Sequence, residues 1–272
     1  MNLNEMDWNE VNRAANNAMT ATHPAGSTAS EKSIFMRMKA GFHHLRLVPA
    51  GNPLKRTYFL QIMQHPVKIP RDDGSGWQDK FVLCWSHMMN DLKQYAGNVE
   101  EQNTKTFISF LGSQKLLTKD EFTKYNTYGC PFCKVFNHLN QMGIETDTKN
   151  KFYPKEQWFF NVIHRSKTFS GMPASGDDGV YIWRTSKTQG NKVNSVVKTI
   201  RGQAGVYYLD INTGRDILLE ATGEGLARRY PVVQFVDAAT PLNLGEKIPH
   251  NLLDILTSSF FEYQKVVNFI KA

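Results

Sequence analysis

The sequence predicts a mostly β fold with added helices, built as a small barrel or a sandwich. Short segments with alternating or continuous apolar patterns recur at close intervals, separated by turns rich in Gly, Pro and Asp. This spacing is typical of antiparallel barrels and sandwiches, and it lacks the regular strand-helix alternation of a parallel sheet. The 272 residues include 41% hydrophobic and 21% charged residues, which is the composition of a chain that buries a core.

Residues 1–30 are predicted to form a short helix and a linker. Apolar residues first recur at roughly helical spacing, and TATHPAGSTAS then supplies small residues with a Pro and a Gly. The N-terminus has no basic region followed by an apolar run, and the sequence has no apolar stretch long enough to cross a bilayer. We therefore expect neither a signal peptide nor a transmembrane helix, and no membrane partner.

Residues 31–248 are predicted to form the β core. FHHLRLVPAG alternates and ends in a turn, and residues 57–85 form a hairpin because TYFLQIMQH and WQDKFVLCW flank the turn sequence RDDGSG. QWFFNVIHR and VYIWRT form a second predicted hairpin. Residues 86–129 are expected to be a helical insertion outside the core, with a capping box at Thr118 and Glu121. NKVNSVVKTIRG is predicted as a helix, and residues 249–272 as one C-terminal amphipathic helix.

The cysteines provide the sharpest chemical signal. Cys130 and Cys133 stand in a CPFC sequence, a spacing that lets two thiolates hold one tetrahedral ion, and Cys84 offers a third. An odd cysteine count does not fit a simple disulfide scaffold. Two histidines compete for the fourth position: His65, at the end of the strand that pairs with the Cys84 strand, and His87, which forms a C-x-x-H sequence with Cys84. Four protein ligands predict a closed, structural zinc site.

No catalytic machinery is visible in the sequence. It contains no Walker loop, HExxH or GxSxG motif. The acidic pairs at residues 72–73 and 177–178 stand in Gly-containing turns, where Asp bonds to its own backbone. The sequence therefore predicts a binding protein rather than an enzyme.

The order of these segments resembles the phage single-stranded-DNA-binding protein family of the T-even, helix-destabilising type. The resemblance lies in FHHLRLVPAG, QHPVKI, FVLC and CPFC, followed by QWFFNVIHR, VYIWR, GRDILL, GEG, YPVV and TPL, and it covers about residues 33–245. It implies an OB-fold with a zinc subdomain at about residues 61–140, which includes the 86–129 insertion. It also implies that the zinc ligands are His65, Cys84, Cys130 and Cys133.

The resemblance implies that the protein coats single-stranded DNA during phage DNA replication, recombination and repair, in the cytoplasm of an infected bacterium. Its implied partners are phage replication proteins (polymerase, helicase loader, recombinase) and further copies of itself on DNA. This chain departs from the family in three ways: a long gap between Cys84 and Cys130, no acidic C-terminal tail, and no Lys or Arg in residues 1–12. The alternatives are a zinc-stabilised, nuclease-like enzyme and an RNA- or protein-binding OB module.

Single-strand binding requires cations that follow the phosphates and aromatic rings on which bases stack. The net charge is +7, which permits an anionic partner. Alternation within VYIWR places Trp183 on one face and Arg184 on the other, so we expect Arg184 to be exposed. The candidate DNA-binding residues are Lys39, Arg46, Lys68, Arg71, Trp77, Phe81, Trp158, Arg165, Trp183, Arg184, Lys187, Lys192 and Lys198.

Overall fold

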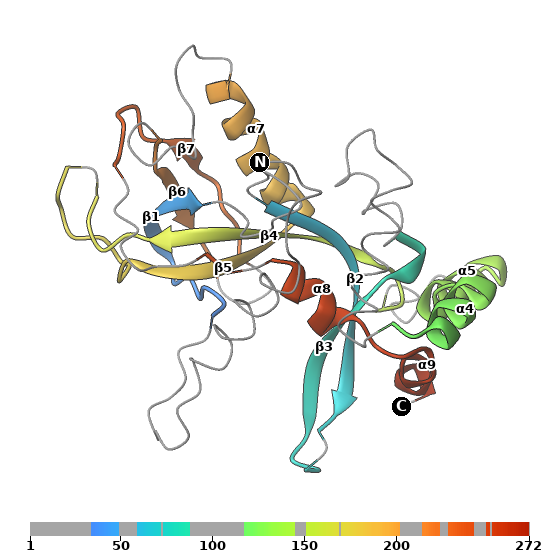
Figure 1. Ribbon diagram of the computed structural model, residues 1–272. Helices are drawn as coiled ribbons and strands as arrows, with labels where there is room; N and C mark the ends of the chain where they lie inside the picture. The colour runs from blue at the N-terminus through green and yellow to red at the C-terminus, as the bar shows by residue number, and fades with distance from the viewer. Residues whose placement is uncertain are drawn as a thin grey trace, which may run out of the picture.

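The computed structural model describes residues 34–48, 59–71, 73–87, 117–144, 151–168, 170–201, 214–223, 228–241, 249–250 and 252–271 (Figure 1). The predicted N-terminal helix and linker, and most of the predicted insertion, lie outside these residues. In the described part of the chain, no helix is long and apolar enough to cross a membrane.

The described fold is a mixed α+β structure around a mostly antiparallel seven-stranded sheet. Its strands are β1 (Gly41–Val48), β2 (Phe59–Pro70), β3 (Trp77–Leu83), β4 (Lys155–His164), β5 (Gly179–Ser186), β6 (Ile217–Ala221) and β7 (Val233–Phe235). The main path runs β3-β2-β4-β1-β6-β7, and β5 pairs with β4. The α+β prediction is confirmed. The described strands form an open sheet, and a closed barrel is not seen among them.

Strand β4 is the centre of the sheet. Its first half pairs with β2 and its second half with β1, while β5 pairs with it from Gln157 to His164. Both predicted hairpins are therefore present: β2 with β3, and β4 with β5. Because β4 is covered on both faces, its sequence is a continuous apolar run instead of a strict alternation.

One face of the sheet packs against α7 (Lys187–Arg201). This core contains Trp158 and Phe160 from β4, Trp183 from β5, and Val193 and Val197 from the helix. The predicted helix at residues 191–202 is present but begins earlier, at Lys187. Figure 1 shows α7 lying above the sheet.

Gly190 is a point of close approach between α7 and β4. A Cβ atom added there would lie 2.3 Å from the ring of Trp158. We expect Gly190→Ala to lower the free energy of unfolding by about 1–3 kcal/mol, because overpacking outweighs the usual helix preference for Ala. Urea denaturation measures this effect. Asn191→Ala, one residue away and exposed, is the matched control and should change stability by less than about 0.5 kcal/mol. An equally stable Gly190→Ala variant would contradict the close packing.

The opposite face packs against the remaining helices. These are α4 (Lys119–Tyr128), α5 (Pro131–Gln141), α8 (Leu253–Ser259) and α9 (Tyr263–Lys271). Figure 1 shows α4, α5 and α9 gathered at one end of the sheet, with α8 nearer its middle. Leu60, Phe159 and Ile182 from the sheet share this second core with Tyr125 of α4 and Phe260.

Two predictions for these helices were wrong. The described end of the expected insertion belongs to the core, because Leu117 and Tyr125 are buried in it. The expected single C-terminal helix is two helices: Phe260 ends α8 in an extended conformation and is buried.

Only half of the capping box forms. Thr118 accepts a hydrogen bond from the Glu121 amide. The Glu121 carboxylate instead accepts a hydrogen bond from the Tyr263 amide, at the start of α9.

Candidate metal centre

Four side chains from three separate parts of the sequence converge on one point: His65, Cys84, and the pair Cys130 and Cys133. One ligand atom from each lies within 4.8 Å of all the others, and these four residues can hold one metal ion. His65 Nε2 lies 3.4 Å from Cys130 Sγ and 3.7 Å from Cys133 Sγ, and the Cys84 and Cys133 sulfurs are 3.4 Å apart. A tetrahedral ion bound at about 2.0–2.3 Å would separate its ligand atoms by about 3.5–3.8 Å, so the spacing is nearly that of a bound site.

The hairpin and α5 bring the ligands together. His65 lies opposite Val82 in the β2–β3 ladder, and Cys84 follows directly after β3. Cys130 is the N-cap of α5, Pro131 begins the helix, and Cys133 lies in its first turn. A helix N-terminus carries partial positive charge, which favours thiolates there.

Backbone and ring contacts hold His65 in the orientation a ligand needs. Its Nδ1 donates to the Phe152 carbonyl at 2.9 Å, so the proton is on Nδ1 and the Nε2 lone pair faces the cysteines. Phe132 of α5 stacks on the imidazole with the ring centroids 5.0 Å apart. His65, Cys84 and Cys130 are all buried. Phe152 was not singled out in the sequence, because a carbonyl partner leaves no signal in residue type.

Contacts among the three thiols shift their pKa values in opposite directions. Hydrogen bonds from the Cys133 and Cys84 thiols hold the pKa of Cys130 far below its ordinary value. The hydrogen bond to Cys130 raises the pKa of Cys133 to about 12, and contact with Cys130 and Cys133 raises the pKa of Cys84. These opposite shifts mean that the three sulfurs resist being ionised together. A bound cation would remove this conflict, because metal ligation deprotonates thiols outright.

His87 lies beside the cluster but outside it. Its Nδ1 is 3.1 Å from Cys84 Sγ, and it does not belong to the group of four that can hold an ion. The geometry thus assigns His65 the ligand position, while His87 can donate a hydrogen bond to the Cys84 sulfur.

The structure buries several residues that the sequence suggested for DNA binding. Trp158 and Trp183 are 3% and 1% exposed and form part of the core, so neither offers a ring face to a base. Arg46 is fully buried and donates to Thr240 at 3.0 Å, with Asp216 3.8 Å away. Arg165 also pairs with Asp216, at 3.1 Å. The two tryptophans and Arg46 serve the fold, and we correct the expectation that they contact DNA. Arg165 is partly exposed but is held by Asp216, and its role in DNA binding stays a prediction.

Four candidate lysines lie away from the β2–β3 hairpin or outside the described residues. Lys187 is exposed but pairs with Glu156 at 3.0 Å, and Lys192 donates to the Tyr230 carbonyl. The side chain of Lys198 lies outside the described residues. Lys39 is exposed and lines a pocket beside β5.

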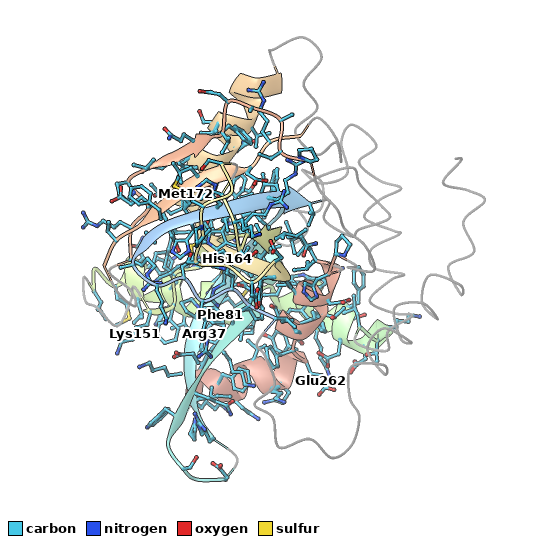
Figure 2. All side chains as sticks on the ribbon, turned by 90° about the vertical axis from the view of Figure 1, so that its left-hand side faces the viewer. Arg37, Phe81, Lys151, His164, Met172 and Glu262 are labelled. Carbon is cyan, nitrogen blue, oxygen red and sulfur yellow. The ribbon has the colours of Figure 1, made fainter. Side chains whose placement is uncertain are left out.

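The remaining residues come together at the β2–β3 hairpin. Paired positions share a face, so Lys68, Trp77 and Phe81 lie on the same side of the hairpin. Arg184 of β5 reaches this side and places its guanidinium 4.1 Å from the centroid of the Phe81 ring. As alternation predicts, Ile182 lies in the core on this face of β5, opposite Trp183. Figure 2 shows Phe81 where the hairpin leaves the body of the sheet.

In comparisons with known proteins, no family model matches the chain, and no curated protein matches its sequence.

Proposed function

We propose that the protein binds single-stranded DNA without sequence specificity, along the hairpin face that carries Lys68, Trp77 and Phe81. In this proposal the sheet is an OB-type core, and the protein coats and protects single strands during phage DNA replication, recombination and repair. The observation that carries the proposal is the exposed indole of Trp77, which is 59% accessible on a face that also presents cations.

The physical requirements of single-strand binding support this surface. Bases of any sequence stack on an exposed ring, and cations follow the phosphates. Arg71 is exposed at the end of β2, and Arg184 reaches the hairpin from β5. Asp79 lies opposite Lys68 in the ladder and also interacts electrostatically with Arg184, so we assign the phosphate contacts mainly to Arg71. The Phe81 ring supports Arg184 through a cation–π contact, which holds the guanidinium in place at little cost in side-chain entropy.

We further propose that the metal is one zinc ion with a structural role. Three thiolates and an imidazole form the soft, tetrahedral donor set that zinc prefers. Since all four positions are filled by protein, no site remains for a reactive water. The ion would tie α5 to the β2–β3 hairpin, and thereby hold the base of the proposed DNA-binding surface. Elemental analysis of the purified protein tests the metal's identity.

Replacing the exposed indole tests the DNA-binding surface. We expect Trp77→Ala to weaken binding to labelled oligo(dT) by about 5- to 150-fold, because stacking contributes about 1–3 kcal/mol per base. Arg71→Gln should reduce the salt dependence of binding by about one phosphate contact. Fluorescence anisotropy at two salt concentrations, with duplex DNA and RNA as competitors, measures both effects.

The control is Tyr153→Ala, which removes another half-exposed ring, one that packs with Phe136 of α5. This variant should bind oligo(dT) as the wild type does. Unchanged oligo(dT) affinity in Trp77→Ala, or equal affinity of the wild type for duplex and single strands, would overturn the proposal. Metal-dependent cleavage of DNA would instead support the enzyme alternative.

A further inference from the structure

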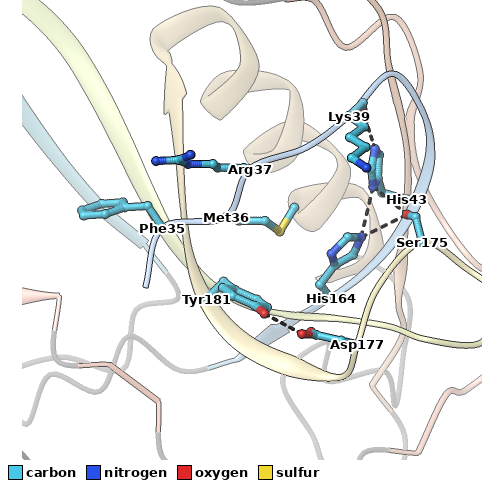
Figure 3. A pocket seen from close by; sticks show the side chains of 9 residues that line it. All are labelled: Phe35, Met36, Arg37, Lys39, His43, His164, Ser175, Asp177 and Tyr181. Atoms are coloured by element: carbon cyan, nitrogen blue, oxygen red, sulfur yellow. Dashed lines mark hydrogen bonds between the residues drawn. The ribbon is translucent and has the colours of Figure 1, made fainter. Parts of the chain in front are cut away.

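A pocket of about 450 Å³ lies between residues 35–39 and the end of the β4–β5 hairpin. Its ends differ in chemistry (Figure 3): Lys39, His43, His164 and Ser175 gather at one end, Phe35 and Arg37 lie at the other, and Tyr181 lies between them. It lies on the opposite face of β5 from the proposed hairpin surface, because Tyr181 packs with the α7 core while Arg184 reaches Phe81. The two regions are thus separate sites.

The polar end is built from two buried imidazoles and a hydroxyl. His43 Nδ1 is 3.0 Å from His164 Nε2, and Ser175 Oγ lies 2.9 Å and 3.2 Å from these two nitrogens. His43 Nε2 donates to the Lys39 carbonyl at 2.9 Å. In the neutral pair, His43 Nδ1 is therefore an acceptor and His164 Nε2–H its donor. Buried polar groups are costly unless they are paired or serve a ligand, and this network opens into a pocket.

The pocket carries excess positive charge. Arg37 and Lys39 are exposed, and no carboxylate in the described part of the chain forms an ion pair with either. The acid that lines the pocket, Asp177, accepts from the Tyr181 hydroxyl at 2.8 Å and from the Gly179 amide. Asp178 is held by Ser166. The polar end can therefore receive an anion, with the Lys39 ammonium as a donor and, once the histidine pair takes up a proton, the imidazolium as a second donor.

We propose that this pocket binds one nucleotide, with its phosphate at Lys39 and the His43–His164 pair and its base between Tyr181 and Phe35. A phosphate needs several convergent donors, a base needs a ring face, and the volume is that of a small-molecule site. The nucleotide is either free or part of a DNA strand. The second case rests on the proposed function and would give the strand a contact beyond the hairpin.

In this proposal, binding of a phosphate group is coupled to proton uptake by the histidine pair. Burial, and then the neighbouring His43, lower the pKa of His164, while Asp177 and Asp178 oppose this. A bound phosphate adds negative charge beside His164 and therefore favours the protonated form of its imidazole. A phosphodiester does not titrate in this range, so the affinity for thymidylyl-thymidine should rise as the pH falls from 8 to 6.

The double variant Arg37→Gln/Lys39→Gln tests the pocket. We expect dTMP to bind wild-type protein and to shift the imidazole NMR signals of His43 and His164, and the double variant to bind dTMP at least about tenfold more weakly. Thymidine and inorganic phosphate should each bind wild type at least about tenfold more weakly than dTMP. Lys119→Gln/Lys151→Gln removes two exposed lysines elsewhere and should leave dTMP binding unchanged.

The results separate the two sources of the nucleotide. Weaker binding of both dTMP and oligo(dT) by the double variant supports a nucleotide within a strand, and weaker binding of dTMP alone supports a free nucleotide. Equal binding of dTMP by the double variant and the wild type, or phosphate bound as tightly as dTMP, overturns the pocket proposal. Failure of the proposed function is distinct, since it appears as unaltered oligo(dT) binding in Trp77→Ala.

Discussion

His65→Ala is expected to lose the bound metal and to lower the free energy of unfolding by about 4 kcal/mol or more, because binding of a structural metal contributes directly to folding. The side chain removed supplies the only nitrogen in the four-ligand cluster, and its Nε2 lies 3.4 Å from Cys130 Sγ. Metal content by mass spectrometry and chemical denaturation measure the two effects. A chelator should destabilise the wild type and leave His65→Ala almost unaffected.

His87→Ala is the matched control for this experiment. It removes an imidazole that is 3.1 Å from Cys84 Sγ but belongs outside the cluster. Loss of a hydrogen bond to a ligand lowers metal affinity by about 10- to 100-fold, which still leaves a tight site filled. If instead His87→Ala lost the metal and His65→Ala kept it, the ligand assignment would be reversed.

Asp216→Asn is expected to destabilise the protein by about 3–5 kcal/mol, because it leaves a buried arginine without its counter-charge. Asp216 accepts from Arg165 and lies 3.8 Å from Arg46, whose side chain is wholly buried. These arginines belong to β1 and to the residue after β4, while Asp216 stands just before β6. The cluster therefore joins three neighbouring strands, and urea denaturation measures its contribution.

Asp79→Asn, on the exposed face of the hairpin, is the control for charge alone and should change stability by less than about 1 kcal/mol. The folded Asp216→Asn protein should bind oligo(dT) with wild-type affinity, since Arg46 is wholly buried and Arg165 lies outside the proposed hairpin surface. A stable Asp216→Asn protein with weakened oligo(dT) binding would contradict this assignment and would indicate that Arg46 or Arg165 contributes to DNA binding.

Local patterns in the sequence predicted much of the fold. Both hairpins form where turn chemistry separates two apolar runs, and α7 forms where apolar residues recur at helical spacing. The C-terminal helix was predicted as continuous because its apolar pattern crosses Phe260 without interruption. The break there comes from tertiary packing, which buries Phe260 against Trp85 and Tyr125, and such contacts have no local signature.

The sequence by itself restricted the candidate metal ligands to three cysteines and one of two histidines, because thiolate chemistry and CxxC spacing limit the possible ligands strongly. Only the tertiary structure decided between His65 and His87, since the choice depends on which imidazole the β2–β3 ladder directs toward α5. Only the tertiary structure likewise decided which of the candidate cationic and aromatic side chains are exposed. Trp77 and Trp183 are indistinguishable by type, yet one is exposed at a hairpin and the other is buried beneath α7. Burial depends on which segments pack together, and that is a property of long-range contacts.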